Sequence, residues 1–156
     1  MSNNIPRRPV IGLATLFIKD DKILLAERRA GKRQGWLNCP GGHFEWGETF
    51  EDCAKRETLE ETGMALTKCE FLTAANGLAL DEDHHYVMIY MLARNWIGEP
   101  RKMEDANGPW EWYPFPGPSD KMLPTTLYAL CVYLRQRDER MMTSGRSCSC
   151  SGDTCQ

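Results

Sequence analysis

Three carboxylates are spaced along one short segment so that they can act together. Glu57, Glu60 and Glu61 lie three and four residues apart, and a helix over Thr49–Thr62 places them on one arc of its surface. The same arc carries the apolar side chains of the segment, which are Phe50, Cys53 and Ala54. The opposite arc carries Glu51, Asp52, Lys55 and Thr62. The three glutamates therefore continue the face that is predicted to be buried.

Burying like charges this close together is unfavourable unless a cation balances them. Arg56 is the basic residue best spaced on this helix to do so, but one guanidinium cannot balance three carboxylates. A hard divalent cation can, because Mg²⁺ binds carboxylate oxygens together with water and substrate phosphates. The alternative is a solvated, glutamate-rich face without a ligand. The preceding glycine-rich turn, Gly41–Glu48, favours the metal because it lets backbone groups approach an ion or a phosphate closely.

The helix and the turn match a pattern with eight fixed positions over 23 residues. These positions are Gly42, Glu48, Arg56, Glu57, Glu60, Glu61, Gly63 and Met64. The pattern resembles the Nudix box. Thr58 is its one departure, since an aliphatic residue is usual there, but the methyl group of threonine should pack adequately.

The resemblance extends over about residues 9 to 135. Pro40–Glu48 and Trp110–Trp112 are similar to the branch of the family that contains eukaryotic nucleoside-triphosphate diphosphatases active on oxidised or thiolated guanine nucleotides. The resemblance implies the Nudix fold, an α/β architecture with a mixed β-sheet sandwiched between α-helices.

The same resemblance implies a metal site and a catalytic set. Glu57 and Glu61 would be the principal ligands of Mg²⁺, or of Mn²⁺, and the Gly41 carbonyl an additional one. Glu60 would be a third ligand or the group that activates water, and Arg56 would orient the glutamates.

Trp96–Pro100 also resembles a segment of bacterial MutT-type members that supplies one more carboxylate. Glu99 is therefore a further candidate ligand, and a simple surface turn is the alternative.

The implied reaction is attack of a metal-activated water on a phosphorus, which cuts a nucleoside triphosphate into the monophosphate and pyrophosphate. The expected substrate contacts are Arg28, Gly42, His43, Tyr86 and Trp112. Basic residues of the loop before the box are candidates for phosphate contacts, namely Arg28, Arg29, Lys32 and Arg33. Aromatic residues that could stack on a base, or could simply be core, are Trp36, Phe44, Trp46, Tyr86, Trp110 and Trp112.

The base remains open because Leu123–Leu127 replaces an aromatic-containing segment used by the eukaryotic branch. Alternative hypotheses keep the diphosphatase activity but give the enzyme a nucleotide sugar, a capped RNA end or a prenyl diphosphate as substrate. A hypothesis of a different functional class is that the protein is a non-catalytic nucleotide sensor. This hypothesis is disfavoured because all the glutamates of the box are present.

Hydrophobic patterning predicts the elements that must position these residues. Two strands over Val10–Lys19 and Lys22–Glu27 should be joined by a turn at Asp20 and Asp21. The glutamate helix should begin at an N-cap, Thr49, and end at a C-cap, Gly63. Further strands are expected over Trp36–Pro40, Cys69–Ala75, His84–Arg94 and Trp110–Tyr113, and a second helix over Thr125–Arg140.

Length and composition fit one domain over residues 9–140, with a flexible start over residues 1–8 and a disordered tail over residues 141–156. Cysteines within the patterned segments should be reduced, and Cys148, Cys150 and Cys155 lack zinc-ligand spacing. The net charge of −3 disfavours a nucleic-acid polymer as partner. Without a signal-peptide pattern or an apolar run of membrane-spanning length, we expect a cytoplasmic protein that acts on small nucleotides, as a homodimer like many relatives.

Overall fold

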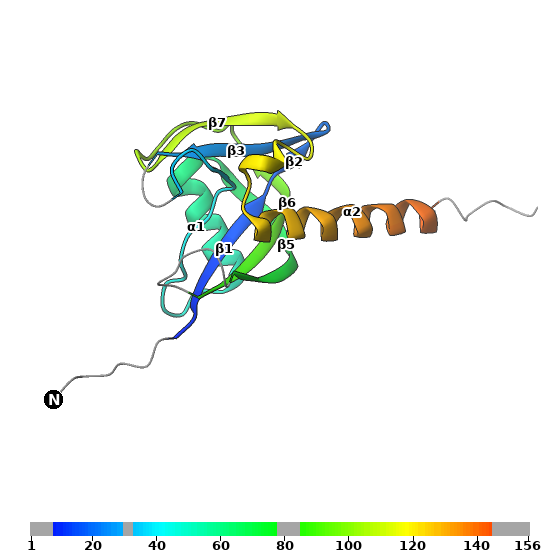
Figure 1. The fold of residues 1–156 in the computed structure, drawn as a ribbon, viewed down its shortest axis with the longest axis horizontal. Helices are drawn as coiled ribbons and strands as arrows, with labels where there is room; N and C mark the ends of the chain where they lie inside the picture. The colour runs from blue at the N-terminus through cyan, green and yellow to red at the C-terminus, as the bar shows by residue number, and fades with distance from the viewer. Residues whose placement is uncertain (1–7, 30–32, 78–84, 145–156) are drawn as a thin grey trace, which may run out of the picture.

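The computed structural model describes residues 8–29, 33–77 and 85–144. Lys32 and the cysteines of the tail lie outside these residues. Within them, two sheets and two α-helices are arranged in layers (Figure 1). No helix in the described part of the chain has the length and apolar character needed to cross a membrane.

The first sheet has the long strand β6 (Tyr86–Ile97) at its centre. Strand β1 (Val10–Leu16) pairs with it in parallel, and strand β5 (Ala65–Gly77) pairs with it in antiparallel orientation. The sheet is therefore mixed, as predicted. Both flanking strands were expected, although β5 and β6 extend further along the chain than the predicted segments.

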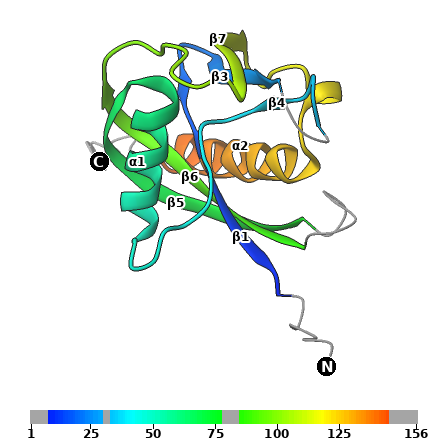
Figure 2. The same ribbon diagram turned by 90° about the vertical axis from the view of Figure 1, so that its left-hand side faces the viewer.

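The two α-helices cover opposite faces of this sheet (Figure 2). Alternate residues of β6 point to opposite sides. Ile89 and Met91 pack in one core cluster with Cys53 and Ala54 of α1 (Phe50–Thr62). Tyr90 and Leu92 pack in the other cluster, whose members in α2 (Pro124–Ser144) are Ala129 and Leu130. The predicted sandwich of a mixed sheet between helices is thus confirmed.

The second sheet comprises β3 (Lys22–Arg28), its neighbours β2 (Ile18–Lys19) and β4 (Leu37–Asn38), and β7 (Asn107–Pro114), which also pairs with β3. The predicted single strand Val10–Lys19 was wrong, because the chain leaves the first sheet after Leu16 and enters the second at Ile18. Phe17 anchors this change of sheet, being fully buried with its ring edge-on to Trp96. The predicted turn follows, and both of its aspartates have positive φ.

Helix α1 has the predicted caps. The side chain of Thr49 accepts a hydrogen bond from the backbone N–H of Asp52, and Gly63 adopts φ of 70°. Both features satisfy backbone groups that a helix end leaves free. The start and end of the glutamate helix are therefore fixed by local sequence.

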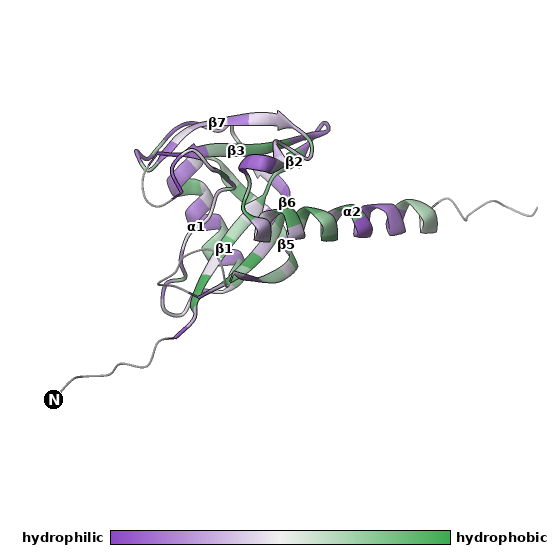
Figure 3. Ribbon diagram, in the orientation of Figure 1, coloured by the Kyte–Doolittle hydropathy of each residue, from purple (hydrophilic) through white to green (hydrophobic). Residues whose placement is uncertain are grey.

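Helix α2 is half packed and half projecting. Its first half is apolar and lies against the sheet, whereas its far half is largely hydrophilic and extends beyond it (Figure 3). The expectation of disorder from residue 141 was wrong for Met141–Ser144, which continue the helix. Glu70 of β5 ties this half to the sheet by accepting hydrogen bonds from Arg94 and from Arg140.

The cysteines in the described residues are free thiols, as expected. Cys39 and Cys53 are buried, so they pack as small hydrophobic residues. Cys131 differs, since it lies exposed on α2.

Candidate active site

The glycine-rich turn is bound to β1 by its backbone. Leu13 and Thr15 donate their N–H groups to the carbonyls of Gly42 and Pro40, both at 2.8 Å. Between these carbonyls, Gly41 has φ of 157°, and a Cβ there would collide with the Leu13 carbonyl. Glycine is required at this position because the backbones approach so closely. The expected use of the Gly41 carbonyl as a metal ligand stays a prediction.

Glu61 is a buried carboxylate held at both oxygens. The Gly41 N–H donates to its Oε2 at 2.9 Å, and the Asn107 amide donates to its Oε1 at 2.9 Å. The indole N–H of Trp110 donates to its backbone carbonyl. Burial raises the pKa of Glu61 to about 7, and the charge of Glu57 raises it in the same direction. The carboxylate is therefore held in place while its negative charge is disfavoured.

Glu57 faces the same space from one turn earlier. Its carboxylate lies against Gly42, where a Cβ would overlap it, so the second glycine of the turn makes room for this side chain. Arg56 donates to Glu57 Oε1 at 2.8 Å, yet burial still raises the pKa of Glu57. Two partly desolvated carboxylates thus lie side by side on one face of α1.

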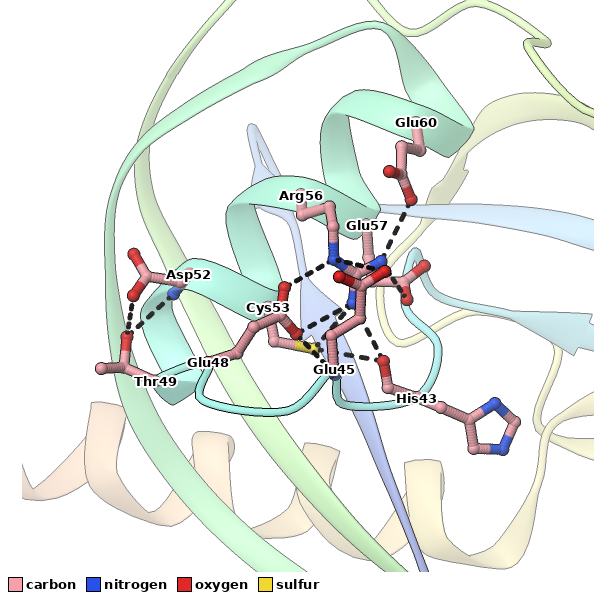
Figure 4. A network of polar contacts seen from close by, with 9 residues as sticks. All are labelled: His43, Glu45, Glu48, Thr49, Asp52, Cys53, Arg56, Glu57 and Glu60. Carbon is pink, nitrogen blue, oxygen red and sulfur yellow. Dashed lines mark hydrogen bonds and ion pairs between the residues drawn. The ribbon is translucent and has the colours of Figure 1, made fainter.

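Arg56 joins the helix to the turn (Figure 4). Its Nε and Nη2 donate to Glu48 at 2.6 and 3.0 Å, and Nη2 also donates to the His43 carbonyl at 2.9 Å. Its Nη1 serves Glu57 and Glu60. The hydrogen bond from Arg56 holds the pKa of Glu48 at about 2. This guanidinium fixes the turn relative to the glutamates, as the resemblance implies.

Glu60 does not share the environment of the other two glutamates. Half of its side chain is exposed (50%), and its carboxylate accepts from Arg56 at 3.1 Å. The predicted buried arc was too wide at this edge, because position 60 is rotated away from the cavity that Glu57 and Glu61 face. Thr62, in contrast, was predicted to lie on the exposed face of the helix. It is fully buried, and its hydroxyl is satisfied by the Thr58 carbonyl and the Met64 N–H.

A cavity of about 820 Å³ opens beside Glu57 and Glu61. Several predicted site residues line it, namely Arg28, Arg33, Gly41, Gly42, His43, Phe44, Arg56, Glu57, Glu61 and Tyr86. The rings of His43 and Tyr86 lie 6.0 Å apart at a tilt of 37°. The structure therefore brings a basic loop, two aromatic rings and two carboxylates around one space.

The same cavity has lining residues that the sequence did not single out one by one. They include Asn38, Met88, Tyr90, Asn107, Leu123 and Thr126. Leu123 and Thr126 belong to the segment in which this chain differs from the eukaryotic branch, which was the available signal for them. The side-chain Oδ1 of Asn38 is buried without a hydrogen-bond partner.

Other aromatic candidates lie elsewhere. Trp112 is not among the residues that line the cavity. Its ring stacks on Trp96 at 6.2 Å and packs against the α1 core cluster, so the structure does not bring it together with the other predicted substrate contacts. Trp110 is core, Trp46 is fully exposed, and Trp36 lies under the guanidinium of Arg33.

The loop before β7 supplies another acidic residue near the glutamates. The charge of Glu104 raises the pKa of both Glu57 and Glu61. Two backbone hydrogen bonds, from Arg101 to the Thr62 carbonyl and from Met103 to the Glu61 carbonyl, hold this loop along the end of α1. Glu104 is thus an acidic neighbour of the site that the resemblance did not indicate, since it pointed to Glu99.

Comparison with known proteins decides the family. The profile of the NUDIX domain matches residues 6–127. The chain belongs to the Nudix family. The crystal structure of a MutT Nudix hydrolase from Burkholderia pseudomallei has a TM-score of 0.74 at 29% identity and covers 80% of this chain and 97% of that one. The fold and the family predicted from the sequence are both confirmed.

Two curated relatives indicate the breadth of this Nudix family. An ADP-ribose pyrophosphatase from Methanocaldococcus jannaschii is 32% identical over 98 residues, which cover 63% of this chain and 58% of that protein. An 8-oxo-dGTP diphosphatase from Escherichia coli is 30% identical over 101 residues, which cover 64% of this chain and 77% of that protein. This chain spans about three fifths of the archaeal relative's length.

The donor set at the cavity fits a hard divalent cation. Glu57 and Glu61 offer carboxylate oxygens, which suit Mg²⁺ or Mn²⁺ better than a soft metal. Within the described residues 8–29, 33–77 and 85–144, no group of three or more His, Cys, Asp or Glu side chains is arranged to hold a metal ion. Mg²⁺ is bound in proteins by few carboxylates together with water and phosphate oxygens, and Glu57 and Glu61 could supply these carboxylates.

Proposed function

We propose that this Nudix protein hydrolyses nucleoside triphosphates, with modified purine deoxynucleotides preferred, to the monophosphate and pyrophosphate. The observation that carries the proposal is one cavity lined by two acidic residues, Glu57 and Glu61, and by two basic residues, Arg28 and Arg33. Such a cavity suits a long, highly charged phosphate chain bound with a cation. The 8-oxo-dGTP diphosphatase relative supports this substrate class.

Each residue has a defined task in this proposal. Glu57 and Glu61 hold a divalent cation, which when bound supplies charge neutralisation and a water of lowered pKa. Arg28 and Arg33 bind phosphate oxygens of the substrate. Arg56 keeps Glu57 against the glycine turn.

The proton of the attacking water needs an acceptor beside the substrate. Glu57 suits this task better than Glu60, because Glu57 lines the cavity and the side chain of Glu60 is half exposed. The water oxygen bonds to the attacked phosphorus, the P–O bond between the α- and β-phosphates breaks, and the departing group leaves with the electron pair.

The archaeal relative favours a second candidate substrate, a nucleotide sugar such as ADP-ribose. Such a substrate carries fewer charges and would use the two arginines less. Capped RNA and prenyl diphosphates are further alternatives within the same chemistry. The homodimer, the cytoplasmic location and the absence of a polymeric nucleic-acid partner stay predictions.

A substrate panel tests the proposal. The catalytic efficiency, kcat/KM, is measured on dGTP, 8-oxo-dGTP, ADP-ribose, GDP-mannose and geranyl diphosphate at one Mg²⁺ concentration, and the product is identified as pyrophosphate or orthophosphate. We expect the triphosphates to be the best substrates and to release pyrophosphate. A tenfold preference for any of the last three would overturn the triphosphate assignment. The absence of hydrolysis of every substrate would instead support a nucleotide sensor.

A further inference from the structure

Asn107 connects the second sheet to the glutamate helix. It is the first residue of β7 and is 6% exposed. Its Nδ2 donates to Glu61 Oε1 at 2.9 Å, across 46 positions of the chain. Its Oδ1 faces the Asn38 amide of β4 at 3.4 Å. A buried amide thus reaches from the second sheet to a carboxylate on α1.

This contact completes the immobilisation of the Glu61 carboxylate. The Gly41 N–H holds Oε2 at 2.9 Å and Asn107 holds Oε1, so donors from two separate elements fix the rotation of the carboxylate about its last bond. Each carboxylate oxygen accepts about two hydrogen bonds, so each retains a lone pair for another ligand. Removing Asn107 would leave Oε1 without its donor and the carboxylate held at one oxygen.

The position of Asn107 also connects the predicted metal site with the predicted phosphate contact, Arg28. In the pairing of β3 with β7, Asn107 lies opposite Arg28, and both residues line the cavity. The register of these strands therefore fixes Arg28 and the donor to Glu61 relative to each other. The β3–β7 pair thus connects the backbone of a candidate phosphate-binding residue to the donor that holds Glu61.

We propose that Asn107 is a positioning residue that orients Glu61 for binding of a divalent cation, an assignment that rests on the function proposed above. Partners of this kind, which hydrogen-bond to metal ligands without touching the metal, typically contribute tenfold to hundredfold to metal affinity. The contrasting role is structural, in which the amide only satisfies a buried carboxylate. That role would affect the stability of the protein and leave the cation affinity of the folded state unchanged.

The test measures Mn²⁺ binding to the nucleotide-free protein by electron paramagnetic resonance, well below the melting temperature. Asn107→Leu keeps the side-chain volume and removes the donor, and Asn107→Ala serves if the leucine variant does not fold. Asn95→Leu is the matched control, because Asn95 is an exposed strand residue of β6. Glu61→Gln reports on the site itself. Thermal unfolding of each variant is recorded in parallel.

We expect the Asn107 variants to bind Mn²⁺ about tenfold more weakly than wild type, and Asn95→Leu to bind it normally. The Mg²⁺ concentration for half-maximal hydrolysis should rise by a similar factor, while KM for the nucleotide at saturating Mg²⁺ stays the same. If Asn107→Leu or Asn107→Ala binds Mn²⁺ within twofold of wild type while Glu61→Gln has lost it, the positioning role is refuted and the proposed function stands. If Glu61→Gln binds Mn²⁺ like wild type, the metal site fails, and both proposals fall.

Discussion

The two sides of the cavity are held in different ways. On the acidic side, the carboxylates of Glu57 and Glu61 receive directed hydrogen bonds from α1, the glycine turn and β7. Another part of the lining, made of Met88, Tyr90, Leu123 and Thr126, carries no charged side chain. The Tyr90 hydroxyl there bonds Thr125 and Thr126 at 3.0 Å each.

This difference separates chemistry from selectivity. Directed bonds fix where charge lies, so the acidic side should tolerate little change in side-chain geometry. An apolar lining recognises shape, and its changes should alter the choice of substrate more than the rate of the reaction. The predictions below test this contrast, beginning with the largest effect.

The largest effect is expected from Glu61→Gln. It removes a metal-binding charge and keeps the volume, so turnover should fall on the order of a hundredfold, or about 2.7 kcal/mol of transition-state stabilisation. The melting temperature should hold or rise, because Asn107 can reverse its amide and a disfavoured buried charge is gone. Steady-state kinetics and thermal unfolding check this, with Glu51→Gln on the outer face of α1 as control. A variant with more than about a tenth of wild-type turnover would disprove the assignment of the metal ligand.

The next effect is expected from Arg56→Lys. An ammonium group cannot reproduce the planar set of donors that serves Glu48, Glu57 and the His43 carbonyl together. We expect kcat/KM to fall about tenfold and the melting temperature to drop. Arg137→Lys, on exposed α2, should change neither quantity. Equal kinetics for the two lysine variants would show that the turn does not need Arg56 to hold its place.

A smaller and different effect is expected from His43→Ala. The imidazole lines the cavity beside Tyr86, whereas the His43 carbonyl that Arg56 contacts is retained in alanine. Loss of about 1 kcal/mol of ring contact should raise KM about fivefold and leave kcat unchanged. Trp112→Phe should lower stability without changing KM, since Trp112 stacks on Trp96. A normal KM in His43→Ala, or a raised KM in Trp112→Phe, would reverse the placement of the substrate described here.

The contrast between local and distant contacts also explains what could be predicted from sequence. The caps of α1, the glycine turn and the spacing of Glu57 and Glu61 depend on neighbours within a few residues, so the pattern revealed them. Asn107 reaches Glu61 across 46 positions through the pairing of β3 with β7, which no local pattern encodes.

The differences between the predicted and the observed positions of two candidate residues have a related origin. Trp112 was a candidate for stacking, but residues two apart on a strand share a face, and Trp110 and Trp112 both face the α1 core cluster. Glu60 was placed on the buried face of the helix because a helical wheel gives the direction of a side chain. The wheel does not show how far the packed neighbours extend over that face. In both cases the sequence pattern offers several side chains of the right type but does not show which of them line the cavity.

Thr58 provides a test of stability within the helix that carries the glutamates. It is fully buried and its hydroxyl has no hydrogen-bond partner, so Thr58→Val should raise the free energy of unfolding by about 1 kcal/mol without changing kcat/KM. Thr62 is the matched control, because it is equally buried but its hydroxyl makes two hydrogen bonds. Thr62→Val should therefore lose about 1 kcal/mol. Urea unfolding measures both variants, and a loss of stability in Thr58→Val would indicate an unseen partner for its hydroxyl.

The smallest effect concerns the far half of α2. The first turn of the same helix carries Thr126, which lines the cavity. Arg94 and Arg140 lower the pKa of Glu70 below 4.5, so this carboxylate adds stability at pH values above about 4.5 and loses it as the pH falls through its lowered pKa. The groups are partly exposed, so Glu70→Gln should reduce the free energy of unfolding by less than about 1 kcal/mol at pH 7.

That difference between Glu70→Gln and wild type should be smaller at a second, acidic pH than at pH 7, because the wild-type carboxylate becomes protonated as the pH falls through its lowered pKa. Urea unfolding at the two pH values measures it, with Glu139→Gln as a control for loss of one exposed charge on α2. A difference that stayed constant with pH would mean that the ion pairs do not hold the helix. The ratio of kcat/KM between dGTP and 8-oxo-dGTP should be unchanged in Glu70→Gln. The Thr126 end of α2 is packed in the core, where hydrogen bonds to Tyr90 hold it independently of the ion pairs.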